Sequence, residues 1–174
     1  MVIDRIYQPI AQNLGVSLLL RNEINTEIQF PPRFFINLIQ ITGNLVANAI
    51  KSTSPNGLVD VVFKMDANED YRTLNLTVTD TGNTIPPELI SAFNKNKQVA
   101  TLMGGDKADS FGTRLNYVMQ LVSEENGRIF VNSGQNSGTT FSLSLPLPKR
   151  YLHRRNGFYP IIENGAMLLD SSLN

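Results

Sequence analysis

Residues 44–51 read Asn-Leu-Val-Ala-Asn-Ala-Ile-Lys and lie inside a long run, 34–53, that is apolar with the period of a helix. Asn44 and Asn48 are four residues apart, so both carboxamides project from the same helix face, and Lys51 lies one turn along. A carboxamide oxygen can ligate Mg²⁺ as a neutral hard donor, and a nearby lysine can offset phosphate charge. Asparagine pairs on helices are usually solvated or capping residues, so this spacing alone does not establish a site.

A second segment, 78–85, reads Val-Thr-Asp-Thr-Gly-Asn-Thr-Ile and ends an apolar strand in a turn. Asp80 stands at the end of that strand, and Gly82 follows it, which lets backbone approach a flat ligand. An aspartate at such a place can accept a hydrogen bond from an exocyclic amine, which is how a pocket distinguishes adenine from guanine. The structural alternative is a turn with an Asx-type hydrogen bond.

The rest of the chain predicts further helices and strands around these two segments. Apolar periodicity predicts helices at residues 2–14, 34–53, 86–93 and 115–125, and strands at 16–20, 58–65, 73–79, 127–133 and 139–147. This order favours an α/β (α+β) two-layer sandwich with a mixed, mainly antiparallel sheet and helices packed on one face. Residues 94–111 are polar, glycine-bearing and aperiodic, so we expect a lid or a poorly ordered loop there.

Composition limits the class of protein. The 174 residues suit one domain, which we place at residues 1–148, followed by a C-terminal tail or linker at 149–174. Basic and acidic residues balance at 15 each, so we expect no nucleic-acid partner and no membrane contact by this domain. There is no cysteine, which excludes a disulfide scaffold or a thiolate nucleophile. No apolar stretch is long enough for a membrane span, so we expect a cytoplasmic domain, whose parent protein could be membrane-anchored.

The order of these motifs resembles the ATP-binding catalytic domain of sensor histidine kinases, a GHKL (Bergerat) nucleotide-binding fold. The similarity covers roughly residues 3–148, and residues 44–51 match the family's N box, Asn-Leu-x-x-Asn-Ala-x-Lys. The resemblance implies that Asn48 coordinates Mg²⁺, while Asn44 and Lys51 face the phosphates and take part in catalysis.

The G1 box of that family, Asp-x-Gly-x-Gly-Ile, is met by Asp80, Gly82 and Ile85, with Thr84 where the second glycine belongs. The resemblance implies that Asp80 binds the adenine amine and that Thr84 narrows the backbone freedom beside it. Of the family's F box, Phe93 remains.

The G2 box, Gly-x-Gly-Leu-Gly-Leu, aligns with Ser-Phe-Gly-Thr-Arg-Leu at 110–115, so Gly112 and Leu115 remain. In the family this helix start offers backbone N–H groups to the β- and γ-phosphates. Arg114 adds a cation close to where the triphosphate would end. Thr140 matches the family's strand threonine near the adenine, although any strand threonine is also expected from β-propensity.

The resemblance implies a histidine protein kinase domain that binds ATP and Mg²⁺. It would transfer the γ-phosphoryl group to a histidine on a separate dimerisation domain, in cis or in trans, with a response regulator as a further partner. The single histidine, His153, lies in a basic tail, so we interpret it as a tail residue rather than the acceptor.

Two other function classes remain open. The departures at Thr84, Ser110, Thr113 and Arg114 favour a degenerate, non-catalytic kinase-like module that binds a response-regulator-type partner. An ATP-hydrolysing relative is disfavoured because Asn44 stands where some of those proteins carry a glutamate base, and an amide cannot take a proton.

Overall fold

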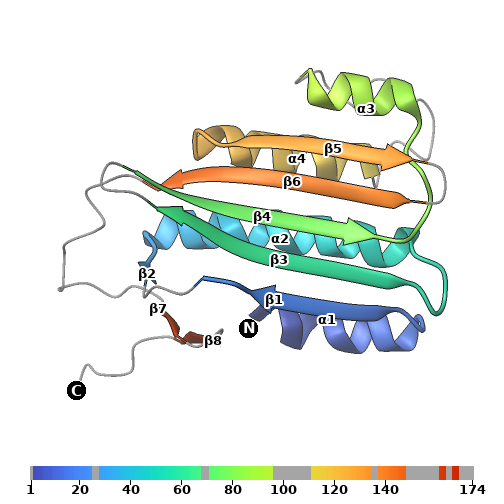
Figure 1. Ribbon diagram of the computed structural model, residues 1–174, viewed down its shortest axis with the longest axis horizontal. Helices are drawn as coiled ribbons and strands as arrows, with labels where there is room; N and C mark the ends of the chain where they lie inside the picture. The colour runs from blue at the N-terminus through green and yellow to red at the C-terminus, as the bar shows by residue number, and fades with distance from the viewer. Residues whose placement is uncertain are drawn as a thin grey trace.

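A five-stranded sheet backed by helices forms the body of the molecule in the computed structural model (Figure 1). The structure describes residues 2–24, 28–67, 71–95, 111–134, 137–147, 161–163 and 166–168. Its elements are α1 (Val2–Asn13), β1 (Ser17–Asn22), β2 (Ile28–Gln29), α2 (Pro32–Ser52), β3 (Leu58–Ala67), β4 (Arg72–Asp80), α3 (Pro87–Asn94), α4 (Phe111–Glu124), β5 (Arg128–Gly134), β6 (Gly138–Leu147), β7 (Ile161–Glu163) and β8 (Ala166–Leu168).

The main sheet has the order β1-β3-β4-β6-β5. Strand β1 runs parallel to β3, and the other three pairings are antiparallel. Along β4 and β6 every second residue is buried, the pattern of a sheet with one face on a core. Helices α1, α2 and α4 lie on that face, and α3 lies beside β5 (Figure 1). The predicted two-layer sandwich with a mixed, mainly antiparallel sheet is confirmed.

The long helix α2 runs across the covered face of the sheet. Pro32 suits its first position, because a proline there loses no intrahelical hydrogen bond. Fully buried side chains such as Ile41, Leu45 and Val46 recur along it with helical spacing and pack into the core. The helix ends at Ser52, where Pro55 follows within a few residues and Asn56 takes a φ of 67°. The backbone N–H of Asn83, in the loop after β4, donates to the backbone oxygen of Ser52, which holds the end of α2 next to the end of β4.

Helix α4 begins earlier than the sequence predicted, at Phe111 rather than near residue 115. After its C-terminal end, Asn126 takes the left-handed conformation, with φ 55°. Gly127 is required for packing: a Cβ there would lie 2.5 Å from the Cδ2 of Leu145. Residues 111–115 of the G2-like segment lie within α4.

A small second sheet joins β2, β7 and β8, three strands that the periodicity did not predict. Our division into a domain at 1–148 and a tail at 149–174 stays a prediction. The predicted lid or loop at 94–111 lies mostly outside the described residues, as does His153. Within the part of the chain that the structure describes, no helix combines the length and the apolar character needed to cross a membrane.

Candidate functional site

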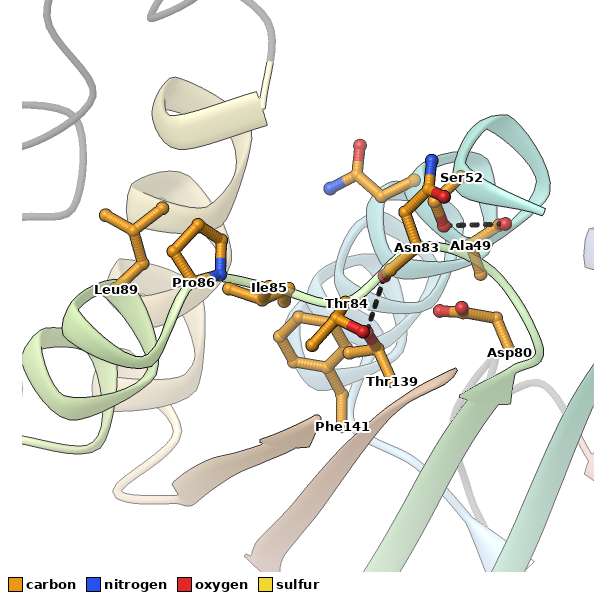
Figure 2. A pocket seen from close by; sticks show the side chains of 11 residues that line it. Ala49, Ser52, Asp80, Asn83, Thr84, Ile85, Pro86, Leu89, Thr139 and Phe141 are labelled. Carbon is orange, nitrogen blue, oxygen red and sulfur yellow. Dashed lines mark hydrogen bonds between the residues drawn. The ribbon is translucent and has the colours of Figure 1, made fainter. Parts of the chain in front are cut away.

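A pocket lies between the C-terminal half of α2, the loop that follows β4 and the start of β6 (Figure 2). The residues that line it are Asn48, Ala49, Ser52, Asp80, Asn83, Thr84, Ile85, Pro86, Leu89, Thr139 and Phe141. Its cavity volume is about 160 Å³. Pockets for whole small molecules usually measure roughly 300–1,000 Å³. This pocket therefore fits one flat part of a ligand, the size of a heterocyclic base.

Asp80 is the charged group of the pocket. It is the last residue of β4, on the strand's buried face, and only 3% of it is exposed. Its Oδ1 accepts a hydrogen bond from the backbone N–H of Gly82 at 2.8 Å, and the backbone N–H of Thr139 also bonds the carboxylate. Burial raises the pKa of Asp80, and these two backbone donors only partly oppose the rise. The carboxylate is held in place by backbone and retains lone pairs that can accept from a ligand N–H group.

Gly82 lets the loop after β4 lie directly on the end of α2. A Cβ on Gly82 would stand 2.3 Å from the backbone oxygen of Ser52, so no other residue fits without moving that backbone. The backbone N–H of Asn83 donates to the same oxygen at 3.1 Å. On the other side, Gly138 has φ +66°, and a Cβ there would lie 1.8 Å from the backbone oxygen of Asp80. Two glycines thus bring three elements together around the carboxylate.

Thr84 ties this loop to the β5–β6 hairpin. Its hydroxyl donates to the backbone oxygen of Gly134 at 3.4 Å, and the N–H of Ile85 donates to the Oγ of Ser133 at 3.0 Å. Thr84 is not among the described non-glycine residues with a positive φ. The threonine in place of a glycine is therefore accommodated without backbone strain and adds a tether.

Thr139 lines the pocket, and Thr140, which we predicted near the ligand, does not. Thr139 pairs with Asp80 in register, is 3% exposed, and its hydroxyl donates to the backbone oxygen of Asn83 at 3.4 Å. Thr140 faces the opposite side of the sheet, with its Oγ1 3.2 Å from that of Thr79. Successive strand residues point to opposite faces, so an assignment that is one residue off places the side chain on the wrong side.

Asn48 lies on the pocket wall formed by α2. It is 5% exposed, its Oδ1 accepts from the Nη1 of Arg114 at 3.5 Å, and its Nδ2 has no hydrogen-bond partner among the described residues. Asn44 lies one turn earlier, and its Nδ2 donates to the backbone oxygen of Gln40 at 2.8 Å. Lys51 is exposed. Neither Asn44 nor Lys51 lines the pocket, so the structure brings only Asn48 of the three to it.

The remaining predicted residues come from α4. Gly112 is buried and Leu115 is 2% exposed within the hydrophobic core, and neither residue lines the pocket. Arg114 faces α2 through its contact with Asn48. The expected pocket residues Asp80, Thr84 and Ile85 do line the cavity, while Gly82 shapes the loop next to it.

Our prediction missed the apolar side of the pocket, formed by Pro86, Leu89 and Phe141 (Figure 2). Phe141 packs edge to face against Phe93, with 5.7 Å between ring centroids. These residues carry no chemical signature in the sequence, because apolar side chains also form the core. Only the alternation along β6, which places Phe141 on the same face as Thr139, could have indicated one of them.

Comparisons with known proteins agree with this architecture. Residues 35–149 match the family described as histidine kinase-, DNA gyrase B-, and HSP90-like ATPase. The autoinducer 2 sensor kinase/phosphatase LuxQ of Vibrio vulnificus strain YJ016 is 35% identical over 150 residues, which are 84% of this chain and 17% of LuxQ. This chain thus spans less than a fifth of that relative.

Two solved structures share the fold at lower identity. Full-length ShkA in complex with AMPPNP has a TM-score of 0.64 at 21% identity over 83% of this chain and 28% of that one. The mycobacterial sensor histidine kinase MprB has a TM-score of 0.60 at 22% identity over 83% of this chain and 91% of that one.

Proposed function

Because this chain belongs to the histidine kinase-, DNA gyrase B- and HSP90-like ATPase family, we propose that it is the ATP-binding catalytic domain of a two-component sensor histidine kinase. Its substrate would be ATP, and the γ-phosphoryl group would pass to a histidine on a separate dimerisation domain. We further propose that residues 1–148 form this domain, that 149–174 form a tail or linker, and that the domain is the cytoplasmic part of a membrane-anchored sensor. A response regulator would be the downstream partner.

The buried carboxylate of Asp80 carries this proposal. It lies beside a base-sized pocket with one apolar wall, and two backbone N–H groups fix its position. The exocyclic amine of adenine would donate to it, whereas guanine presents a carbonyl oxygen at the equivalent place, which a carboxylate repels. The apolar side chains of Leu89 and Phe141 would cover the base. The site therefore supports adenine over guanine nucleotides.

Asn48 would mark the phosphate end of the ligand. Among the described residues there is no group of three or more acidic or histidine side chains that could hold a metal ion. The Oδ1 of Asn48 is a neutral ligand, so Mg²⁺ would fit here only when bound with ATP, with phosphate and water oxygens completing its shell. Such an ion would have to displace the guanidinium of Arg114 from that oxygen before it could neutralise phosphate charge during transfer. The roles of Asn44 and Lys51 toward the phosphates stay predictions.

In catalysis this domain would position the ATP and neutralise the charge of its phosphates, because phosphoryl transfer requires little covalent chemistry from the protein. Asp80 would fix the base, and the phosphates would extend from it toward Asn48 and α4. The acceptor histidine would come from the dimerisation domain, which brings its own nucleophile.

The test is nucleotide titration by calorimetry, followed by a transfer assay. We expect saturable binding of ATP and at least tenfold weaker binding of GTP. This difference corresponds to the loss of about one charged hydrogen bond, the one between the base and the carboxylate of Asp80. Phosphate should then move from labelled ATP to an added dimerisation domain of a sensor kinase. Absence of ATP binding at millimolar nucleotide would refute the proposal.

The second candidate is the non-catalytic kinase-like module, and the presence of Arg114 against Asn48 favours it, because a guanidinium stands at the predicted metal ligand. This alternative predicts ATP binding without transfer, together with binding of a response-regulator-type partner. The same transfer assay separates the two candidates.

A further inference from the structure

Arg114 occupies an unusual position for a cation. It is the fourth residue of α4, in the first turn, and that turn contains no acidic residue. The N-terminus of a helix carries partial positive charge, so an arginine there is unfavourable unless an anion is also present. The placement of Arg114 therefore requires an explanation outside the stability of the helix.

The protein groups around Arg114 do not neutralise it. No ion pair of Arg114 is found within the described part of the chain. From α2 the contacting group is the neutral amide of Asn48. From α1 the neighbour is Tyr7, whose pKa the charge of Arg114 lowers, but burial raises that pKa by more, so the phenol stays protonated. The guanidinium thus faces two neutral groups.

The neighbouring amide of Asn48 is itself incompletely bonded. Its side chain is 95% buried, and its Nδ2 has no partner among the described residues. Its Oδ1 accepts only the long, 3.5 Å contact from Arg114. Buried polar groups are almost always hydrogen-bonded, so an unpaired amide N–H indicates that a further acceptor belongs there. Within the described residues, an amide donor without an acceptor and a guanidinium without an anion therefore lie next to each other on facing helices.

We propose that Arg114 binds the phosphate groups of the nucleotide in place of a divalent cation, so that this domain binds ATP without requiring Mg²⁺. The inference rests on the proposed function. A guanidinium has five donors in a planar fork that matches phosphate oxygens two at a time. Arg114 already contacts the Oδ1 of Asn48. The resemblance assigns this same oxygen to Mg²⁺ as a ligand. A guanidinium and a metal ion at one amide oxygen would repel each other. Lys51, the other basic candidate, is exposed, whereas Arg114 is half-buried against Asn48.

The test is calorimetric titration of the full 174-residue chain with ATP, once in Mg²⁺ and once in EDTA. For the unmodified protein we expect the two dissociation constants to agree within about threefold. Arg114→Ala should lose roughly tenfold or more in EDTA, the effect of one charge-assisted hydrogen bond, and clearly less in Mg²⁺, because the freed Asn48 can then ligate the ion.

Three controls isolate the phosphate contact. Arg128→Ala removes an exposed arginine from β5 and should leave both dissociation constants unchanged. Arg114→Lys keeps the charge and should retain part of the EDTA affinity. Adenosine, which has no phosphate, should bind the unmodified protein and Arg114→Ala equally. Circular dichroism verifies that each variant is folded.

The outcomes separate the two proposals. If the unmodified protein binds ATP only in Mg²⁺, or if Arg114→Ala leaves the EDTA affinity intact, the role of Arg114 is refuted while the nucleotide site stands. If adenosine and ATP both fail to bind under either condition, the proposed function itself fails.

Discussion

Replacing Asp80 with asparagine tests whether its carboxylate serves the ligand or the fold. The substitution keeps the shape of the side chain but removes its charge. It also keeps Oδ1 as the acceptor for the N–H of Gly82, a distance of 2.8 Å in the unmodified protein. A hydrogen bond to a charged group contributes about 1.5–3 kcal/mol, so ATP affinity should fall roughly 10- to 150-fold. Stability should change by no more than about 1 kcal/mol, because removing a charge that burial disfavours offsets the weakened hydrogen bond from the backbone N–H of Thr139.

The pH dependence of stability and of ATP binding follows from the raised pKa of Asp80. The pKa of Asp80 is higher in the folded than in the unfolded protein, so the folded state holds this proton more tightly. This residue's contribution to the free energy of unfolding therefore falls as pH rises from the unfolded pKa to the raised folded pKa. ATP affinity should move in the opposite direction, because the amine requires the ionised carboxylate. Asp80→Asn should abolish both dependences.

Calorimetric titration with ATP across a pH series, together with thermal denaturation, measures both effects. We expect the melting temperature of Asp80→Asn to lie within about 4 °C of the unmodified protein, equivalent to about 1 kcal/mol for a chain of this size. Asn75→Asp, which alters a charge on the open face of the same strand, is the matched control and should leave ATP affinity unchanged. Full ATP affinity in a folded Asp80→Asn variant would refute the reasoning.

Three further predictions concern the loop and the strands around the pocket. Gly82→Ala should destabilise the protein by about 1–3 kcal/mol, because its Cβ would stand 2.3 Å from backbone, whereas Gly134→Ala meets only a serine hydroxyl; chemical denaturation compares them. Thr139→Val should weaken ATP binding and Thr140→Val should not, as titration of the two variants would show. Asn94→Ala should lower the free energy of unfolding by about 1–3 kcal/mol, since two hydrogen bonds to β5 are lost; an unchanged melting temperature would contradict this.

The sequence predicted the elements of the main sheet and its helices well, because their periodicities are long and regular. The α2 run, for example, buries a stripe with helical spacing over six turns, and only its boundaries shifted by one or two residues. The strands of the second sheet, at 28–29, 161–163 and 166–168, were missed. Two or three residues are too few to show a period, and their pairing joins segments far apart in the chain.

The site was predicted where a residue's chemistry is distinctive and missed where geometry decides. Asp80 and Asn48 have side chains with a clear ligand chemistry, and both line the pocket. Thr139 and Thr140 are chemically identical, so only the register of β6 against β4 decides which of them faces the pocket. The contact between Arg114 and Asn48 joins positions 66 residues apart, and no local pattern contains it.

The side chain of Asn94 completes an edge of the main sheet. Its Nδ2 donates to the backbone oxygen of Val131 and its Oδ1 accepts from the N–H of the same residue, both at 2.9 Å. Strand β5 is the last in the sheet, so these two backbone groups point outward, where another strand could otherwise pair with them. One amide thus imitates a strand neighbour at the centre of the exposed edge. The consequence is that a strand of another molecule cannot pair with β5 at Val131, which works against edge-to-edge aggregation of the domain.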